Sequence, residues 1–329
     1  MAESCKVDTS PDSSVNCANQ FVEKNVVAAV QGVDYAADAA LPILQKAGIV
    51  EIGVFAFSPA MNTAQGDAYF TLFSNEDNYA GDLVTHQSLG AESVAVVMPD
   101  LPTSRALDED VIQPTAEKLG MSATAFYYAP EVDWTTFAAT IVSTSPDGVS
   151  FPASDEATCT AGVEALRTAG FDRYIHASAC SELIDQLDPA MLENVFNHNE
   201  FFYPNFTSIP EKAQNDIDIF TRYMERDYPG YSSLVLTQLG FHIAVQVADM
   251  LRQVPGEITA ESVKAAMPTV TGESFFRDAG DVYDCSGANS WPGTTACSSS
   301  EFYTVLTPEG QKELLPNQPP DLTGLFPSN

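Results

Sequence analysis

The chain has 329 residues, of which 45 are acidic and 14 basic, so its formal net charge is −31. Such an acidic excess repels phosphate backbones, which excludes nucleic acid as an expected partner. No apolar run is long enough to span a bilayer, and the length predicts about two domains.

Six cysteines fall in the sequence as three local pairs. Their clustering favours three short disulfide loops and an oxidising compartment, although the connectivity does not follow from sequence alone. No CxxC motif is present and the four histidines are not spaced with the cysteines as ligands, so we expect neither a metal nor another cofactor. The pairs are Cys5 and Cys17, Cys159 and Cys180, and Cys285 and Cys297.

Short apolar runs alternate with amphipathic stretches from about residue 26 to residue 254. This alternation is typical of βαβ units, in which a parallel sheet carries helices on its faces. In the first part of the chain we expect a loop over 58–68, strands over 26–30, 50–55 and 93–98, and helices over 36–46, 77–89 and 104–119.

The same pattern continues in the second part of the chain. Asp133 is expected to cap a helix that ends at the Pro-Asp-Gly turn 146–148. The further strands are expected over 124–128, 148–151, 174–177, 195–203 and 301–306, and the further helices over 154–169, 181–187, 210–228, 232–253 and 259–267.

The ordered set of these elements resembles the type I periplasmic solute-binding proteins, which include the leucine/isoleucine/valine-binding proteins of ABC importers. Segment 21–32 is similar to the family's helix, valine-rich strand and glycine. Segment 39–48 resembles the helix that follows, and 69–74 with Gly81 resembles the crossing into a second lobe. Segments 133–149 and 220–231 resemble two later family signatures.

This resemblance implies two Rossmann-like lobes with parallel sheets, joined by a three-segment hinge. We expect lobe I at 1–76 and 205–300, and lobe II at 77–204 and 301–329. Family members begin with a strand and a helix that this chain lacks, so lobe I is expected to miss its N-terminal elements. The same missing segment is expected to hold the export signal, because Met1 leads directly into polar residues.

In this family a small ligand lies between the lobes, at turns that follow the strands. In lobe I the resemblance places Tyr35, Ala36, Phe55, Ala56 and Phe57 at these turns. Ala36 stands where the family often has a serine, which weakens the case for a plain α-amino acid. The aromatic rings suit a planar or apolar ligand, although a place in the core is an equal alternative.

In the crossover and lobe II the same reasoning selects Asp77, Thr103, Ser154 and Ser178. Asp77 is expected to meet a ligand amine, and the hydroxyls to donate hydrogen bonds. The alternative for each is helix capping or a hydrated loop. His176 ends a strand near the expected cleft and is the one histidine to examine as a ligand contact.

The sequence therefore predicts an extracytoplasmic, monomeric solute-binding protein that delivers a small molecule, an amino acid or a related and possibly aromatic compound, to a membrane ABC permease. It lacks the G-x-S-x-G, P-loop and G-x-G-x-x-G motifs, so no enzyme is expected. Two alternatives stay open: the ligand-sensing domain of a receptor or regulator, and a secreted acidic hydrolase.

Overall fold

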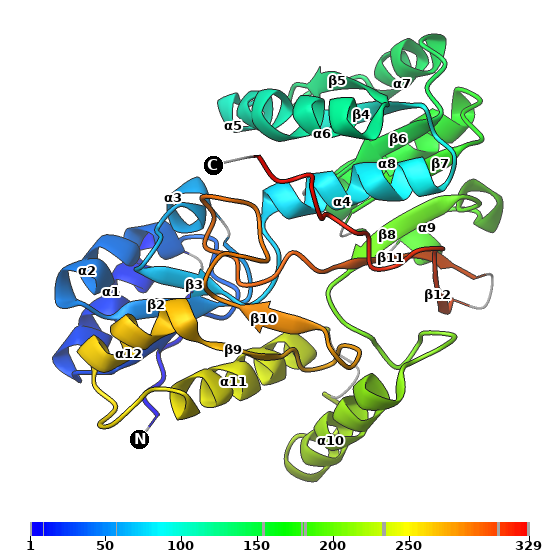
Figure 1. Cartoon of the computed structure of the whole chain (residues 1–329). Coiled ribbons are helices and arrows are strands. Elements are labelled where there is room, and N and C mark those ends of the chain that lie inside the picture. Colours follow the sequence, from blue (N-terminus) through cyan, green and yellow to red (C-terminus); the bar gives the residue numbers. More distant parts are fainter. Residues whose placement is uncertain are drawn as a thin grey trace. The chain divides into compact units, whose positions relative to one another are not determined.

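Short apolar runs and helical segments fold into an α/β protein whose two main sheets are built of parallel strands (Figure 1). The expected fold class is confirmed. The computed structural model describes residues 2–8, 10–56, 58–152, 155–178, 180, 183–231, 235–307 and 310–327.

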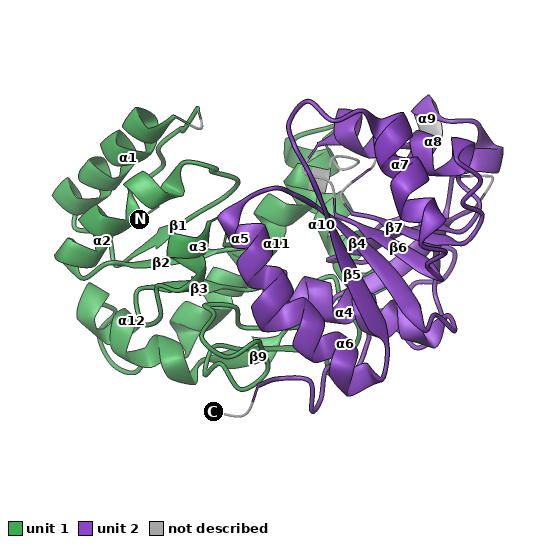
Figure 2. Cartoon of the chain, turned by 90° about the horizontal axis from the view of Figure 1, so that it is seen from above, with its two compact units in different colours: residues 1–74, 210–300, 328–329 green, residues 75–209, 301–327 purple. Residues whose placement is uncertain are grey.

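The chain divides into two compact units, which Figure 2 shows in different colours. Unit 1 comprises Met1–Ser74 and Pro210–Ser300, and unit 2 comprises Asn75–Ile209 and Glu301–Pro327. The chain therefore passes from one unit to the other after Ser74, after Ile209 and after Ser300.

Unit 1 is built on a three-stranded parallel sheet of order β1-β2-β3. A separate antiparallel pair joins β9 to β10. The strands are β1 (Ala28–Val30), β2 (Val50–Gly53), β3 (Ala68–Phe70), β9 (Thr271–Glu273) and β10 (Val282–Asp284). The helical elements are α1 (Pro11–Glu23), η1 (Ala37–Ala39), α2 (Leu41–Ala47), α3 (Pro59–Asn62), α10 (Glu211–Asp227), α11 (Val235–Arg252), α12 (Ala260–Ala266) and η4 (Met267–Thr269).

The two faces of β2 meet different surroundings because successive side chains of a strand point to opposite sides. Val50 and Ile52 are fully buried in an apolar cluster with residues of α11 and α12. Glu51 points to the opposite face, and its Cα partners are Ala29 in β1 and Ala68 in β3. A carboxyl group is thus placed inside the sheet layer of unit 1.

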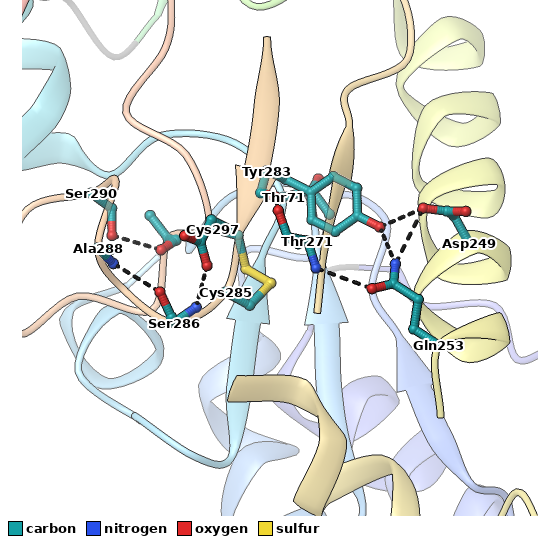
Figure 3. Close-up of a disulfide and its surroundings, with 12 residues drawn as sticks. Thr71, Asp249, Gln253, Thr271, Tyr283, Cys285, Ser286, Ala288, Ser290 and Cys297 are labelled. Atoms are coloured by element: carbon teal, nitrogen blue, oxygen red, sulfur yellow. Dashed lines mark hydrogen bonds between the residues drawn. A yellow bond between two sulfur atoms is a disulfide. The ribbon is translucent and has the colours of Figure 1, made fainter. Parts of the chain in front are cut away.

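The outer edge of β3 is paired with the segment 295–297 rather than with a full strand. The Phe70 amide donates to the Thr295 carbonyl at 2.9 Å, and the Cys297 amide donates to the Phe70 carbonyl at 2.7 Å. A disulfide from Cys297 to Cys285 ties this segment to the end of β10 (Figure 3). Disulfides also join Cys5 to Cys17 and Cys159 to Cys180, so all three expected local loops are present.

Unit 2 contains a seven-stranded sheet of order β12-β11-β8-β7-β6-β4-β5. The five strands from β4 to β8 are parallel, and β11 and β12 add antiparallel strands at one end. The strands are β4 (Ser93–Pro99), β5 (Ser122–Tyr128), β6 (Gly148–Phe151), β7 (Tyr174–Ala177), β8 (Val195–Asn199), β11 (Phe302–Leu306) and β12 (Lys312–Leu314). The helical elements are α4 (Asn75–Ser88), α5 (Pro102–Leu107), η2 (Asp108–Ile112), α6 (Gln113–Leu119), α7 (Trp134–Ser143), α8 (Glu156–Thr168), α9 (Leu183–Gln186) and η3 (Pro189–Met191).

Helices cover both faces of this larger sheet, and residues 94–98 of its parallel strand β4 are apolar without interruption. Along β4, Ala95 and Val97 pack in a cluster with residues of α7 and α8, whereas Val94 and Val96 pack with residues of α4 and α6. Asp133 caps α7 as expected, accepting hydrogen bonds from the backbone amides of the first turn.

Three sequence predictions of secondary structure were wrong in detail. The helix expected over 104–119 is interrupted by the π-helical segment η2, just before Pro114, whose nitrogen has no proton to donate to the preceding turn. The loop expected over 58–68 contains the short helix α3, which Ser58 caps. The strand expected over 195–203 ends at Asn199.

Candidate functional site

The carboxyl ends of β1, β2 and β3 lie at one edge of the unit 1 sheet because the three strands are parallel. Ligands of open α/β sheets bind at such edges. Three segments follow these strand ends, namely 31–36, 54–56 and 71–74. They bring Tyr35, Ala36, Phe55 and Ala56, four of the residues expected to bind ligand, to the same edge of unit 1.

The first of these segments is shaped by Asp34, which is buried. Its carboxylate accepts hydrogen bonds from the Ser14 hydroxyl at 2.7 Å and from the Ala36 amide at 3.0 Å. The Gln31 side-chain amide donates to the Asp34 carbonyl at 3.3 Å. This turn leaves the Tyr35 side chain 70% exposed, while Ala36 is half-buried and presents no hydroxyl.

The second segment contributes Phe55 and Ala56, both half-buried. The Phe55 ring meets the Phe73 ring edge-on, with centroids 5.4 Å apart. Phe57 lies outside the described residues. The hydroxyl of Ser58 donates to Asp38, so the loop after β2 is joined to the loop after β1.

A buried carboxyl lies behind this edge. Glu51 is 3% exposed, and burial, helped by the charges of Asp34 and Asp38, raises its pKa to about 8. Its Oε2 atom has no hydrogen-bond partner among the described residues, and the same holds for Oε1 of Gln31. Unit 1 therefore keeps an uncharged carboxyl at neutral pH next to two carboxylates.

The carboxyl ends of the parallel strands of unit 2 form a second edge. Thr103 is exposed on the second residue of α5, beside the half-exposed ion pair of Arg105 and Asp100 at 2.7 Å. Ser178 follows β7 and is buried, and its hydroxyl lies 3.2 Å from Nδ1 of His198. Ser154 lies outside the described residues.

Asp77 lies in the first turn of α4, just after the chain leaves unit 1 at Ser74. Its side chain is fully buried. Nearby Asn78 donates to Oε2 of Glu301 at 2.7 Å, and the Tyr303 hydroxyl donates to Oε1 of Glu301 at 2.6 Å. Burial raises the pKa of Glu301 to about 8. These contacts join the start of α4 to the start of β11, the two elements that begin unit 2 after two of the three passages.

His176 is not at the edge of unit 2, as the sequence suggested, but inside its core. Its Nδ1 lies 3.1 Å from the carboxylate of Asp82, which is also 3.4 Å from Nε2 of His86. Burial opposes the charge of Asp82, but His176 and His86 hold its pKa below the usual value. Burial lowers the pKa of His86 and brings that of His198 to about 3. The group is a structural polar network that sequence patterns did not reveal.

A hollow of about 450 Å³ lies at the opposite, amino-terminal edge of the unit 2 sheet. It is lined by Asp147, Asp172, Arg173, Tyr174 and Asn194, among others. Arg173 and Asp147 form an ion pair there. This hollow is therefore distinct from the edge that carries Thr103 and Ser178.

The described ranges contain no group of three or more His, Cys, Asp or Glu side chains arranged to hold a metal ion. Within the same ranges, no helix combines the length and apolar character needed to cross a membrane. The two edges present hydroxyls, carboxylates and aromatic rings, which can make reversible contacts with a small molecule.

Comparison with known proteins assigns the chain to a family. Residues 6–290 match the family model described as periplasmic binding protein. No match was found among curated protein sequences.

Solved structures are similar in fold along most of the chain. An extracellular ligand-binding receptor from Verminephrobacter eiseniae is 18% identical, with a TM-score of 0.71 over 92% of this chain and 85% of the other. A putative branched-chain amino acid ABC transporter from Rhodospirillum rubrum is 16% identical, with a TM-score of 0.71 over 93% and 85%. The branched-chain amino acid transporter substrate-binding protein LivJ from Streptococcus pneumoniae, solved with isoleucine, is 14% identical, with a TM-score of 0.63 over 93% and 84%.

Proposed function

Because the chain belongs to the periplasmic binding protein family, whose members bind ligands and are not enzymes, we propose that it is the extracytoplasmic solute-binding protein of an ABC importer. The single observation that carries this proposal is the family match over residues 6–290. Three disulfides support a location in an oxidising compartment.

The proposed ligand is a small molecule, an amino acid or a related compound, and the candidate contacts lie at the strand edge of each unit taken by itself. The relatives from R. rubrum and S. pneumoniae, named for branched-chain amino acid transport, support an amino-acid-like ligand. Three passages of the chain between the units support closure by hinge rotation. The closed form would then be presented to a membrane permease by a monomeric binding protein.

The proposed site consists of Tyr35, Ala36, Phe55 and Ala56 in unit 1, together with Thr103 and Ser178 in unit 2. Phe57, Asp77 and Ser154, which the sequence also selected, remain part of this proposal. Asp77 is the least accessible of them because its side chain is fully buried. A ligand contact of Asp77 therefore requires rearrangement at the start of α4.

A thermal-shift screen tests this proposed function. Amino acids, their amides, aromatic acids, short peptides and small organic cations are added singly at millimolar concentration. A compound that binds only the native state adds about 2.7 kcal/mol of stability at a hundred times its Kd. We expect at least one compound to raise Tm and to be recovered chemically unchanged.

A second assay distinguishes binding from catalysis. The stabilising compound is incubated with the protein overnight, and the amount that remains unchanged is quantified by NMR. Conversion of the compound would contradict a pure binding role and favour a hydrolase. A panel in which no compound raises Tm would contradict the proposed ligand class.

A further inference from the structure

The three segments of the unit 1 edge carry negative charge and aromatic rings, and Arg277 and Lys212, whose charges act on His242 behind Thr71, come from other elements. Segments 31–38, 54–60 and 71–74 contain two acidic residues, Asp34 and Asp38, and neither lysine nor arginine. Asp34 is buried at the turn, whereas Asp38 is exposed. A ligand carboxylate at this edge would therefore meet repulsion without a compensating positive side chain in these segments.

The hydroxyls of the same edge are already engaged within the protein. Ser58 donates to Asp38, and Thr71 lies 3.1 Å from Nε2 of His242 and is fully buried. Neither hydroxyl is placed to donate to an incoming anion. The loss of a hydroxyl at Ala36 removes a further donor of this kind.

The helical elements that begin at this edge within unit 1 are short. Among the described residues of unit 1 they are η1, with three residues, and α3, with four, while segment 71–74 leads into α4 of unit 2. Such short elements align few peptide dipoles, so their partial positive charge is small. The features that normally attract a carboxylate at a strand edge are therefore weak in unit 1.

Features that attract a cation are present at the same place. Tyr35 is 70% exposed directly beside Asp34, and the Phe55 and Phe73 rings meet one segment away. Aromatic faces attract organic cations through their quadrupole, and most strongly where a carboxylate is also near. Rings and carboxylates together are the usual surroundings of a substituted ammonium group.

Two buried polar atoms at this edge also lack a partner. Gln31, which is 7% exposed, holds its side-chain amide against Asp34, and its Oε1 atom has no hydrogen-bond partner among the described residues. Oε2 of Glu51 also has no hydrogen-bond partner among the described residues. The charges of Asp34 and Asp38 help burial to raise the pKa of this carboxyl. Buried polar atoms are nearly always paired, so both atoms point to a partner that the described residues do not provide.

We propose that the unit 1 edge binds the positively charged group of an organic ammonium ligand, through Asp34, Asp38, Gln31 and the Tyr35 ring. This inference rests on the proposed function, since it names the ligand class of the same site. The ligand's ammonium group, rather than a carboxylate, is then the group that unit 1 recognises.

Matched compounds separate the two charged groups of an amino acid. Leucinamide keeps the ammonium group and lacks the carboxylate, N-acetylleucine keeps the carboxylate and lacks the ammonium group, and choline and putrescine supply cations alone. Calorimetric titration is expected to show binding of at least one of the cationic compounds, which are leucinamide, choline and putrescine. No measurable binding of N-acetylleucine is expected.

Binding of N-acetylleucine with none by leucinamide, choline or putrescine would overturn the cation inference and leave the proposed function standing. Absence of binding by every cationic compound, at concentrations up to 10 mM as a rough upper limit for a specific site, would also overturn it. The wider ligand panel separately decides whether the protein binds small molecules at all.

Variants locate the site. Asp38→Asn is expected to weaken binding of the cationic compound about tenfold, as for loss of one charge-assisted contact. Tyr35→Ala is expected to have an effect of similar size. Glu23→Gln is the matched control because it removes one exposed charge at the end of α1, ahead of the amino end of β1. Equal affinities of Asp38→Asn and Glu23→Gln would contradict the assignment.

Proton release gives a readout that a merely structural role of Asp38 would not change. A cation beside Asp34 and Asp38 favours the ionised form of Glu51. In the neighbouring strands β1 and β3, the Cα partners of Glu51 are both alanine. Titrations near pH 8 with a cation of fixed charge such as choline, in buffers of different ionisation enthalpy, should therefore show protons released on binding. In Glu51→Gln the release should vanish. Proton uptake on binding would contradict the proposal.

Discussion

The two strand edges differ in what they do with their polar groups. In unit 2, Ser178 contacts His198, Asp82 contacts His176 and the two histidine rings meet edge-on; Ser178, Asp82 and His176 are buried and His198 is half-buried. In unit 1, Asp38 and Tyr35 are exposed, at the edge of a sheet of only three strands. Under the proposed function, this buried network of unit 2 serves the stability of that unit, while the exposed groups of unit 1 are available to a ligand.

The sheets also end differently. In unit 2, the antiparallel strands β11 and β12 extend the sheet. In unit 1, the short segment 295–297 pairs with β3 and is held by the disulfide of Cys285 and Cys297. A small sheet buries less apolar surface than a large one, so unit 1 should depend more on this covalent link.

The largest expected effect is in the buried network of unit 2. Asp82→Ala removes the carboxylate that His176 and His86 share, and should lower the free energy of unfolding of unit 2 by about 3–5 kcal/mol. Urea denaturation measures the change. Glu109→Ala, an exposed substitution in the same unit, is the control and should change it by less than about 0.5 kcal/mol. Equal effects of the two would show that the network is not structural.

Removing the disulfide tests the dependence of unit 1. Replacing both Cys285 and Cys297 by serine opens a loop of sequence separation 12 and should cost about 3 kcal/mol. Hydrogen exchange should then rise in β3 and in residues 295–297 before it rises in unit 2. A uniform increase in both units would contradict the link between this disulfide and the β3 edge.

A pH series compares two buried carboxyls, one in each unit. Glu51 and Glu301 have their pKa raised to about 8 from 4.5, mainly by burial. The folded state holds these protons between pH 4.5 and 8, so the free energy of unfolding should fall as pH rises through this range, by at most about 1.4 kcal/mol per group and pH unit.

Histidines give the opposite slope on the acidic side. Burial brings the pKa of His198 and His242 to about 3 from 6.5, so stability should fall as pH drops below 6.5. Glu301→Gln should therefore flatten the decline above about pH 6.5, in unit 2. Glu51→Gln should do the same in unit 1, and below about pH 6.5 each variant should show the opposing histidine slope more fully. An unchanged slope in both variants would show that neither carboxyl stays protonated in the fold.

The smallest effect on stability is expected at the exposed unit 1 edge. Tyr35→Ala and Asp38→Asn should each change the free energy of unfolding by less than about 0.5 kcal/mol in the absence of ligand. A loss of several kcal/mol, measured by the same urea titration, would show that these side chains maintain the fold and would remove the contrast between the units.

Local patterns predicted the elements well where they carried a periodic or capping signal. The strand over 174–177 has the bounds that the sequence indicated, and Asp133 caps its helix. Proline and serine chemistry was missed at two places, Pro114 and Ser58, where the backbone forms a π segment and a short helix. Neither appears in a search for apolar periodicity.

The site was harder to predict because burial depends on residues distant in the sequence. His176 looked like an edge residue, but its partner Asp82 lies on α4, 94 positions earlier in the chain, and both are buried. Glu51, between Val50 and Ile52, and Glu301, after a run of serines, gave no signal as isolated carboxylates. In contrast, the position of Tyr35 in the loop after β1 could be read from the sequence, because it comes shortly after an apolar run and a glycine, while its role as a ligand contact stays a prediction.

The central claim is that a small molecule binds at the carboxyl ends of the strands of both units. Hydrogen exchange with and without the stabilising ligand tests it most directly. The account predicts slower exchange in residues 31–38, 54–56 and 71–74 of unit 1 and in residues 100–104 and 177–178 of unit 2. Protection confined to the hollow around Arg173 and Asn194, at the opposite edge of unit 2, would contradict it.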